Sequence, residues 1–146
     1  MEIVKMKHEH LVPCAKLLIE AYNGLPWNNN WNDDSSIKYL MEYFVNPSFA
    51  GFIIIEDEKV IGAAFCHEKT WWTGDELFID EFYISPVFQH RGLGTELLKH
   101  IENYVEKRKL AGITLLTNRH MPSLDFYVKN KFTKAKHIVF MYKELK

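Results

Sequence analysis

The segment at residues 85–95, SPVFQHRGLGT, constrains the fold of this chain more than any other part of the sequence. It follows an apolar and aromatic stretch, residues 77–84, that is typical of a strand. After it, apolar side chains recur at helical spacing, namely Leu97, Leu98, Ile101, Tyr104 and Val105. The predicted order is strand, glycine-containing turn, helix. Backbone N–H groups in such a turn can converge on an anion, and the helix dipole adds positive potential, so the segment suits a pyrophosphate.

The spacing of the glycines excludes two familiar phosphate-binding motifs. Gln89, Gly92 and Gly94 form a Gln-x-x-Gly-x-Gly pattern, which differs from the Gly-x-Gly-x-x-Gly of dinucleotide-binding turns. It also lacks the Gly-Lys-Ser/Thr ending of a Walker loop. On the glycines alone, an ordinary tight turn remains the alternative to a phosphate site.

Length and composition narrow the class of protein. With 146 residues, 47% of them hydrophobic and 14% aromatic, the chain is expected to form a single globular domain, residues 1–146. A net charge of −1 provides no basic field for nucleic acid. No apolar run approaches the roughly 18–20 residues of a membrane span, and no signal peptide is apparent. Cys14 and Cys66 lack metal-ligand spacing. We therefore expect a reduced, cytoplasmic protein without nucleic-acid, membrane or metal partners.

The segment as a whole carries a more specific signal. Pro86 and the aromatic Phe88 precede the Gln89-x-x-Gly92-x-Gly94 pattern, and an amphipathic helix follows it. In this combination the segment resembles the acetyl-CoA-binding motif of the GNAT N-acetyltransferases. The resemblance implies that backbone N–H groups around the turn hold the pyrophosphate, that Arg91 adds charge and that Leu93 packs inward. It implies a cofactor contact surface at Gln89, His90, Arg91, Gly92, Leu93, Gly94 and Thr95. Before the turn, the backbone of Phe82, Tyr83 and Ile84 would pair with the pantetheine arm.

The order of elements also matches this family along nearly the whole chain. Periodicity and turn residues predict helices near residues 11–22, 34–45, 92–109 and 122–130, and strands near 3–6, 49–55, 60–65, 77–84, 112–117 and 137–142. The implied fold class is α/β (α+β), with a mixed, mainly antiparallel sheet of six to seven strands and helices on both faces. In that family the strands corresponding to 77–84 and 112–117 splay apart and admit the cofactor.

Two consecutive acids interrupt the strand before the turn. Asp80 and Glu81 are candidates for the base that deprotonates an amine, since an amine with a pKa near 10 is mostly protonated at neutral pH. Strand alternation predicts that their side chains point to opposite faces of the sheet. Salt bridges are the alternative explanation for either acid. Residues 78–84, FIDEFYI, are similar to the diamine (spermidine/spermine) acetyltransferase branch, which carries two acids followed by two aromatics there. Which acid acts as the base stays open.

A tyrosine near the C-terminus is the candidate general acid. Residues 123–132, SLDFYVKNKF, resemble the GNAT segment in which a tyrosine protonates the departing thiolate, so the resemblance assigns this role to Tyr127. A hydrogen-bonded core tyrosine is the alternative. The family often has Asn seven residues earlier, where this chain has His120. Asn118 is the other candidate contact with the cofactor. Lys131 replaces the usual glycine before Phe132.

Loop tryptophans are candidates for the wall of an amine pocket. Trp27, Trp31 and Trp72 lie in predicted loops, where an aromatic face attracts a cation, although hydrophobic cover for the sheet or a dimer contact would explain them equally well. The resemblance, together with these residues, implies a transferase, namely an acetyl-CoA-dependent N-acetyltransferase. It would act by direct attack of the primary amine of a polyamine, diamine, lysine-like compound or aminoglycoside. The alternatives are a protein N-terminal or lysine acetyltransferase and a non-catalytic acetyl-CoA sensor. A homodimer is expected by analogy.

Overall fold

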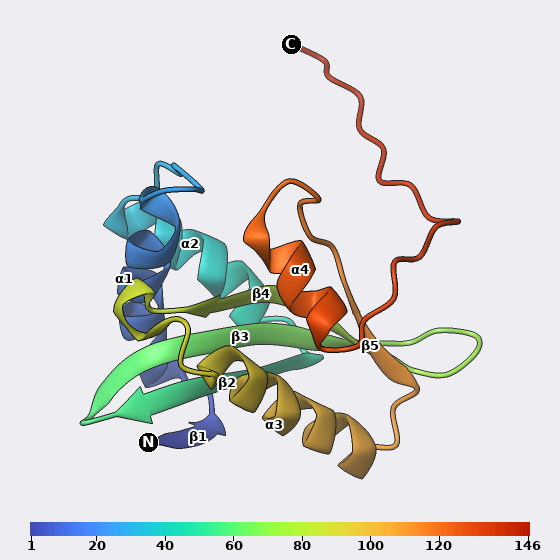
Figure 1. The fold of residues 1–146 in the computed structure, drawn as a ribbon, viewed down its shortest axis with the longest axis horizontal. Helices are drawn as coiled ribbons and strands as arrows, with labels where there is room; N and C mark the ends of the chain where they lie inside the picture. The colour runs from blue at the N-terminus through green and yellow to red at the C-terminus, as the bar shows by residue number, and fades with distance from the viewer. The chain divides into compact units, whose positions relative to one another are not determined.

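The computed structural model describes residues 1–146 as two compact units, Met1–Leu116 and Thr117–Lys146 (Figure 1). The first unit contains one five-stranded sheet in the order β1-β2-β3-β4-β5. Its strands are β1 (Glu2–Lys5), β2 (Phe49–Glu56), β3 (Lys59–Lys69), β4 (Glu76–Ile84) and β5 (Gly112–Leu115). The first four strands pair antiparallel and β5 runs parallel to β4, so the predicted mixed, mainly antiparallel sheet is confirmed.

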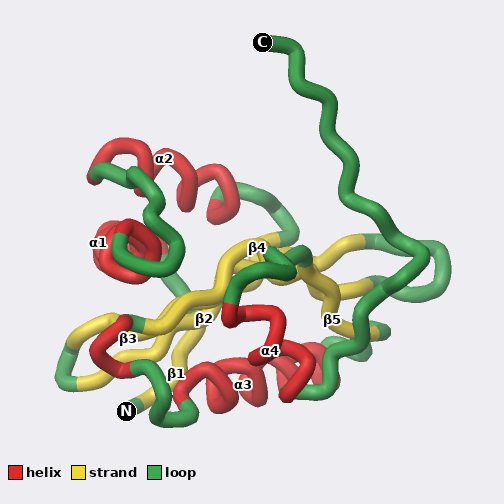
Figure 2. Tube along the Cα trace, turned by 45° about the horizontal axis from the view of Figure 1, so that its top comes forward, coloured by secondary structure: helices red, strands yellow, loops and turns green.

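Helices cover both faces of this sheet, as predicted. Helices α1 (Leu11–Asn23) and α2 (Asp33–Phe44) lie on one face, and α3 (Leu93–Lys107) lies on the other (Figure 2). Alternation along β2 divides its side chains between the two layers. Ile53 joins the core under α1 and α2, whereas the ring of Phe52 contacts the rings of His100 and Tyr104 on α3. Short 3-10 turns, His8–His10 and Pro86–Phe88, precede α1 and the glycine turn.

The start of α2 differs slightly from the sequence prediction. A helix was predicted near residues 34–45, whereas α2 begins at Asp33 and Asn32 is its N-cap. Its side-chain oxygen accepts the Ser35 backbone N–H at 2.8 Å, and the Ser35 hydroxyl accepts the Asn32 backbone N–H at 3.0 Å. This reciprocal pair satisfies two backbone donors at the start of α2 and so fixes where the helix begins.

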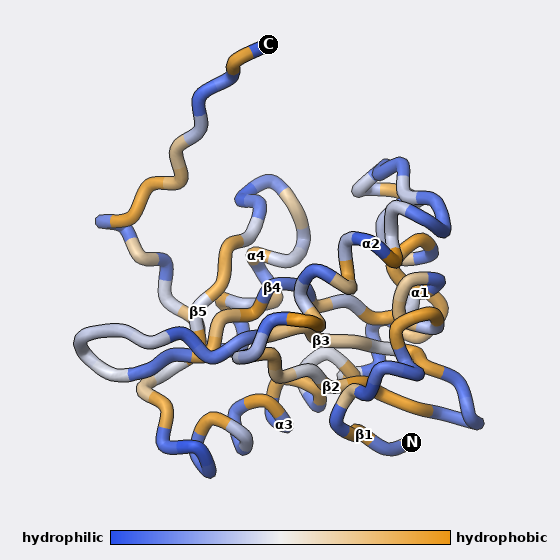
Figure 3. Tube along the Cα trace, turned by 180° about the vertical axis from the view of Figure 1, so that it is seen from behind, coloured by the Kyte–Doolittle hydropathy of each residue, from blue (hydrophilic) through white to orange (hydrophobic).

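The second unit contains α4 (Pro122–Lys129) and no strand. The strand predicted at residues 137–142 does not form, so that prediction is wrong. The structure therefore has one sheet of five strands, where six to seven were expected. Residues 138–142 are apolar or aromatic but are exposed on an extended tail (Figure 3). An apolar run has the composition of a strand, but it becomes one only when a neighbouring strand supplies hydrogen bonds.

No helix combines the length and the apolar composition that a membrane span requires.

Candidate functional site

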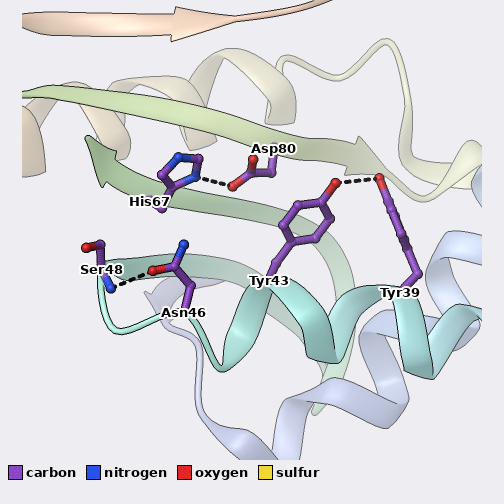
Figure 4. Close-up of polar contacts among 6 residues, drawn as sticks. All are labelled: Tyr39, Tyr43, Asn46, Ser48, His67 and Asp80. Carbon is purple, nitrogen blue, oxygen red and sulfur yellow. Dashed lines mark hydrogen bonds and ion pairs between the residues drawn. The ribbon is translucent and has the colours of Figure 1, made fainter. Parts of the chain in front are cut away.

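A β-bulge at Asp80 places two carboxylates on the same face of the sheet. In the β3–β4 ladder Phe65 lies opposite Glu81 and Cys66 lies opposite Ile79, so Asp80 is the extra residue of β4. The prediction that Asp80 and Glu81 point to opposite faces is therefore wrong, because the bulge interrupts the alternation. Figure 4 shows Asp80 on the side of the sheet that faces α2 (Figure 4).

Asp80 is held by a histidine of the neighbouring strand. Nδ1 of His67 lies 2.7 Å from Oδ2 of Asp80, and the side chains are 25% and 9% exposed respectively. A carboxylate only accepts hydrogen bonds, so Nδ1 carries the proton and donates it. The His67 ring packs against the ring of Phe78 with the centroids 5.4 Å apart. Burial raises the pKa of Asp80, and the hydrogen bond and charge of His67 partly oppose this rise.

Glu81 has a separate set of partners on the helices. The Tyr39 hydroxyl donates to Oε2 of Glu81, and the Tyr43 hydroxyl donates to the Tyr39 oxygen at 3.1 Å. Tyr39 and Tyr43 lie four residues apart on α2 and therefore share one helix face. Burial raises the pKa of Glu81. Hydrogen bonds from Tyr39 and from Tyr22 of α1 lower it, and the charge of Asp80 raises it again.

This arrangement can bind a cation and accept a proton. The two carboxylates are partly buried and close enough for the charge of Asp80 to raise the pKa of Glu81. A carboxylate with a raised pKa is a stronger base than an exposed one, and it remains able to ionise near neutral pH. Two negative charges on an aromatic surface also attract a positively charged amine.

The structure places the three predicted tryptophans in two different environments. Trp27 packs edge-on against Tyr22 at 5.2 Å, and Trp31 lies over Tyr39 at 4.8 Å, so both contact tyrosines that hydrogen-bond near Glu81. Trp72 is 86% exposed in the turn between β3 and β4. The structure therefore brings Trp27 and Trp31 to the acids and leaves Trp72 at the surface.

Pairing between β4 and β5 ends just before the acids. The ladder ends at Ile79 opposite Leu115, where β5 itself ends, whereas β4 continues to Ile84. The predicted divergence of these two strands stays a prediction. Tyr83 and Ile84 at the end of β4 are buried. The Phe82 carbonyl already accepts a hydrogen bond from the Tyr22 hydroxyl at 3.2 Å.

The glycine turn has the backbone that an anion cradle requires. His90 and Gly92 adopt left-handed φ values of +64° and +77°, and Gly92 is the N-cap of α3. A Cβ added at Gly92 would meet no atom within 4 Å, so this face of the turn is open to a ligand. The first backbone N–H groups of a helix have no partner within it and favour negative charge. The turn therefore fits a pyrophosphate.

The side chains of the turn have mainly structural contacts. The Gln89 amide donates to the Ile84 carbonyl at 3.2 Å and ties the turn to the end of β4. The Arg91 guanidinium lies 5.2 Å from the Phe88 ring, and its residue is exposed beside the cradle. Leu93 is half-buried at the start of α3 and is followed by Gly94 and Thr95 in the first helical turn. Contacts with an anion would therefore come chiefly from the backbone.

Three candidate site residues, Asn118, His120 and Tyr127, belong to the second unit. Asn118 accepts the backbone N–H of His120 at 2.8 Å through its side-chain oxygen, so these two candidates form one local turn. Tyr127 is buried and packs edge-on against Phe126 and Phe132 at 5.2 Å and 5.3 Å. Lys131 has a φ of +71°, the left-handed conformation that a glycine would adopt without strain. The general-acid role of Tyr127 stays a prediction.

Sequence reasoning missed the groups that surround the acids. Tyr39 and Tyr43 carried a usable signal, since two tyrosines four residues apart share a helix face. His67 carried none, because its approach to Asp80 depends on a bulge whose position is determined by strand pairing.

Comparisons with known proteins place the chain in a structural context. The model of the acetyltransferase (GNAT) family matches residues 14–132. The fold is similar to that of a ribosomal-protein-alanine N-acetyltransferase from Brucella melitensis biovar Abortus 2308 (13% identity, TM-score 0.79, 99% of this chain and 100% of that chain covered). It is also similar to an aminoglycoside acetyltransferase from an uncultured soil metagenomic sample in complex with sisomicin (17%, 0.75, 99% and 96%). A third similar structure is AAC(6')-Iy in complex with the bisubstrate analogue CoA-S-monomethyl-acetylneamine (19%, 0.73, 99% and 98%). No curated protein sequence matches the chain.

The raised pKa of Glu81 predicts a particular pH dependence of stability. A carboxyl whose pKa is higher in the folded than in the unfolded state stabilises the fold fully below its unfolded pKa. That contribution is lost as pH rises through the folded pKa. Glu81→Gln cannot titrate. Its free energy of unfolding, relative to wild type, should therefore increase as the pH rises above about 4 in urea titrations. Glu20→Gln, an exposed position on α1, is the control. A difference that stays constant or falls with pH would contradict the assigned shift.

Proposed function

The chain belongs to the acetyltransferase (GNAT) family, and from this premise we propose that it acetylates the primary amine of a small cationic molecule. The protein is an N-acetyltransferase that uses acetyl-CoA, which supplies an acetyl group already activated as a thioester. The observation that supports a cationic acceptor is the pair of partly buried carboxylates, Asp80 and Glu81, on one face of the sheet. Polyamines, diamines, lysine-like compounds and aminoglycosides all carry such an amine. The polyamine acetyltransferases are the branch that the acids most resemble.

Each acid receives a distinct proposed role. Asp80 has one protein hydrogen bond, from His67, so we assign it the role of base that takes the proton from the amine nitrogen. Glu81 is held by Tyr39 and adds negative charge for the ammonium form. Trp31 over Tyr39 and Trp27 against Tyr22 provide aromatic faces for the same cation. Holding the amine close to the acetyl group supplies much of the remaining rate enhancement.

The glycine turn and Tyr127 each receive a proposed role of their own. The backbone of residues 89–95 would hold the pyrophosphate of the cofactor, with Arg91 adding positive charge, and the backbone of residues 82–84 would hold the pantetheine arm. The Tyr127 hydroxyl would act as the general acid, which donates its proton to the thiolate that leaves when the acetyl group is transferred. We also propose that residues 1–146 act as one domain, since the family match spans both units. The homodimer and the cytoplasmic location stay predictions.

Release of CoA thiol from acetyl-CoA with a panel of amines tests the acceptor and the base together. We expect turnover with spermidine, putrescine, lysine or kanamycin, and little with a short peptide whose amine is its N-terminus. Asp80→Asn should lower kcat/KM by about 10²–10⁴, the usual contribution of a general base. Asp57→Asn changes an exposed acid in the turn between β2 and β3 and should have no effect. Tyr127→Phe should lower kcat with little change in KM. Turnover with the peptide alone would contradict a small-amine acceptor and indicate a protein acceptor. Full activity of Asp80→Asn would contradict the role of Asp80 as the base.

The left-handed backbone at Gly92 predicts a loss of cofactor affinity on substitution. An alanine fits the open space there, but it disfavours φ of +77° by about 1–2 kcal/mol. The free turn then relaxes, and binding has to restore the strained conformation. Gly92→Ala should therefore bind CoA roughly tenfold more weakly in calorimetric titration. Gly112→Ala also gains a Cβ in open space, without a left-handed φ, and should bind CoA like wild type. Equal affinities for CoA in the two variants would contradict the proposal that the glycine turn binds the pyrophosphate.

A further inference from the structure

His67 is the one polar neighbour that favours the ionised form of Asp80. Its ring nitrogen Nδ1 lies 2.7 Å from Oδ2, and it is the source of both effects that lower the pKa of this carboxyl. The other titratable groups facing the pair do not help. Glu81 is a second acid beside it. Burial raises the pKa of the Tyr43 hydroxyl from α2 and of the Cys66 thiol of β3, and the charge of Asp80 raises both further, so they stay neutral.

Asp80 needs such a partner for two physical reasons. It is the extra residue of the bulge, so its direction is not determined by strand alternation. Its side chain is only 9% exposed, and burial favours the protonated acid, which cannot accept another proton. A hydrogen bond from a neighbouring strand can both fix the direction of the Asp80 side chain and favour its ionised form. The His67 ring is itself held in place by Phe78, which lies opposite it in the ladder and packs against it.

Resting on the proposed role of Asp80 as base, we propose that His67 is a positioning residue for acetyl transfer. Its Nδ1–H holds Oδ2 of Asp80, which leaves Oδ1 to face the amine, and it favours the ionised form of the carboxylate. Oδ1 would take the proton from the amine nitrogen. As the new C–N bond forms, the C–S bond of the thioester would break, and the thiolate that leaves would gain a proton from a general acid or from water. His67 itself exchanges no proton with the substrate and need not touch it.

The dependence of kcat/KM on pH separates this role from a merely structural one. In His67→Ala, Asp80 loses the partner that lowers its pKa, so the acid limb of the profile should move to higher pH. The amine titrates identically in every variant, so differences between profiles report the enzyme. His67→Asn places an amide N–H near the position of Nδ1 and should restore part of the activity. His100→Asn is the matched control, because His100 is also half-buried and packs against a phenylalanine, Phe52.

Titration of the Asp80 carboxyl by carbon NMR, in the protein without cofactor, gives a second readout. Asp80→Asn identifies the signal, and its midpoint should lie higher in His67→Ala than in wild type or His100→Asn. An unchanged midpoint and acid limb in His67→Ala would overturn the role of His67. A loss of activity that follows only a lower melting temperature would overturn it too. Full activity of Asp80→Asn would instead overturn the proposed base, which distinguishes the two failures.

Discussion

Between Ile79 and Glu81, strand β4 carries one residue more than β3, and this bulge at Asp80 determines which side chains meet in the candidate site. Strict alternation would send Asp80 toward the face covered by α3, where Leu97, Leu98 and Ile101 form a dry apolar layer. A carboxylate there would be costly without a partner. The bulge turns Asp80 to the other face, within reach of His67 and beside Glu81. An irregular hydrogen-bond pattern is the structural cost of bringing two acids together.

The surrounding elements resolve the conflict between burial and ionisation by giving each acid its own donor. β3 supplies His67 to Asp80, and α2 supplies Tyr39 to Glu81, with Tyr43 supporting Tyr39 from the next helical turn. The Asn32 cap satisfies the first backbone donors of the helix that carries both tyrosines. Burial keeps both pKa values raised, as a base for an amine requires, while the donors hold the side chains in defined directions.

Local patterns were sufficient to predict much of this molecule. The 3.6-residue period of α3, the strand before it and the glycines between them define a cradle whose Gly92 is left-handed, as expected of a glycine at such a turn. Features that depend on pairing between distant segments were not predictable. The bulge at Asp80 arises from register with β3, and the contact with His67 follows from it. The apolar tail at residues 138–142 has a strand-like composition without a strand to pair with.

A crystal structure with a bisubstrate analogue, CoA joined covalently to spermidine, would test the central claim most directly. If the bulge builds the acceptor site, the nitrogen that bears the acetyl-mimicking linker should lie within hydrogen-bond distance of Asp80 Oδ1, with His67 still on Oδ2. The pyrophosphate should then lie on the backbone of residues 90–95. A linker nitrogen remote from both carboxylates, with Asp80 and Glu81 still bound only to His67 and Tyr39, would show that these acids are structural and that the amine is deprotonated elsewhere.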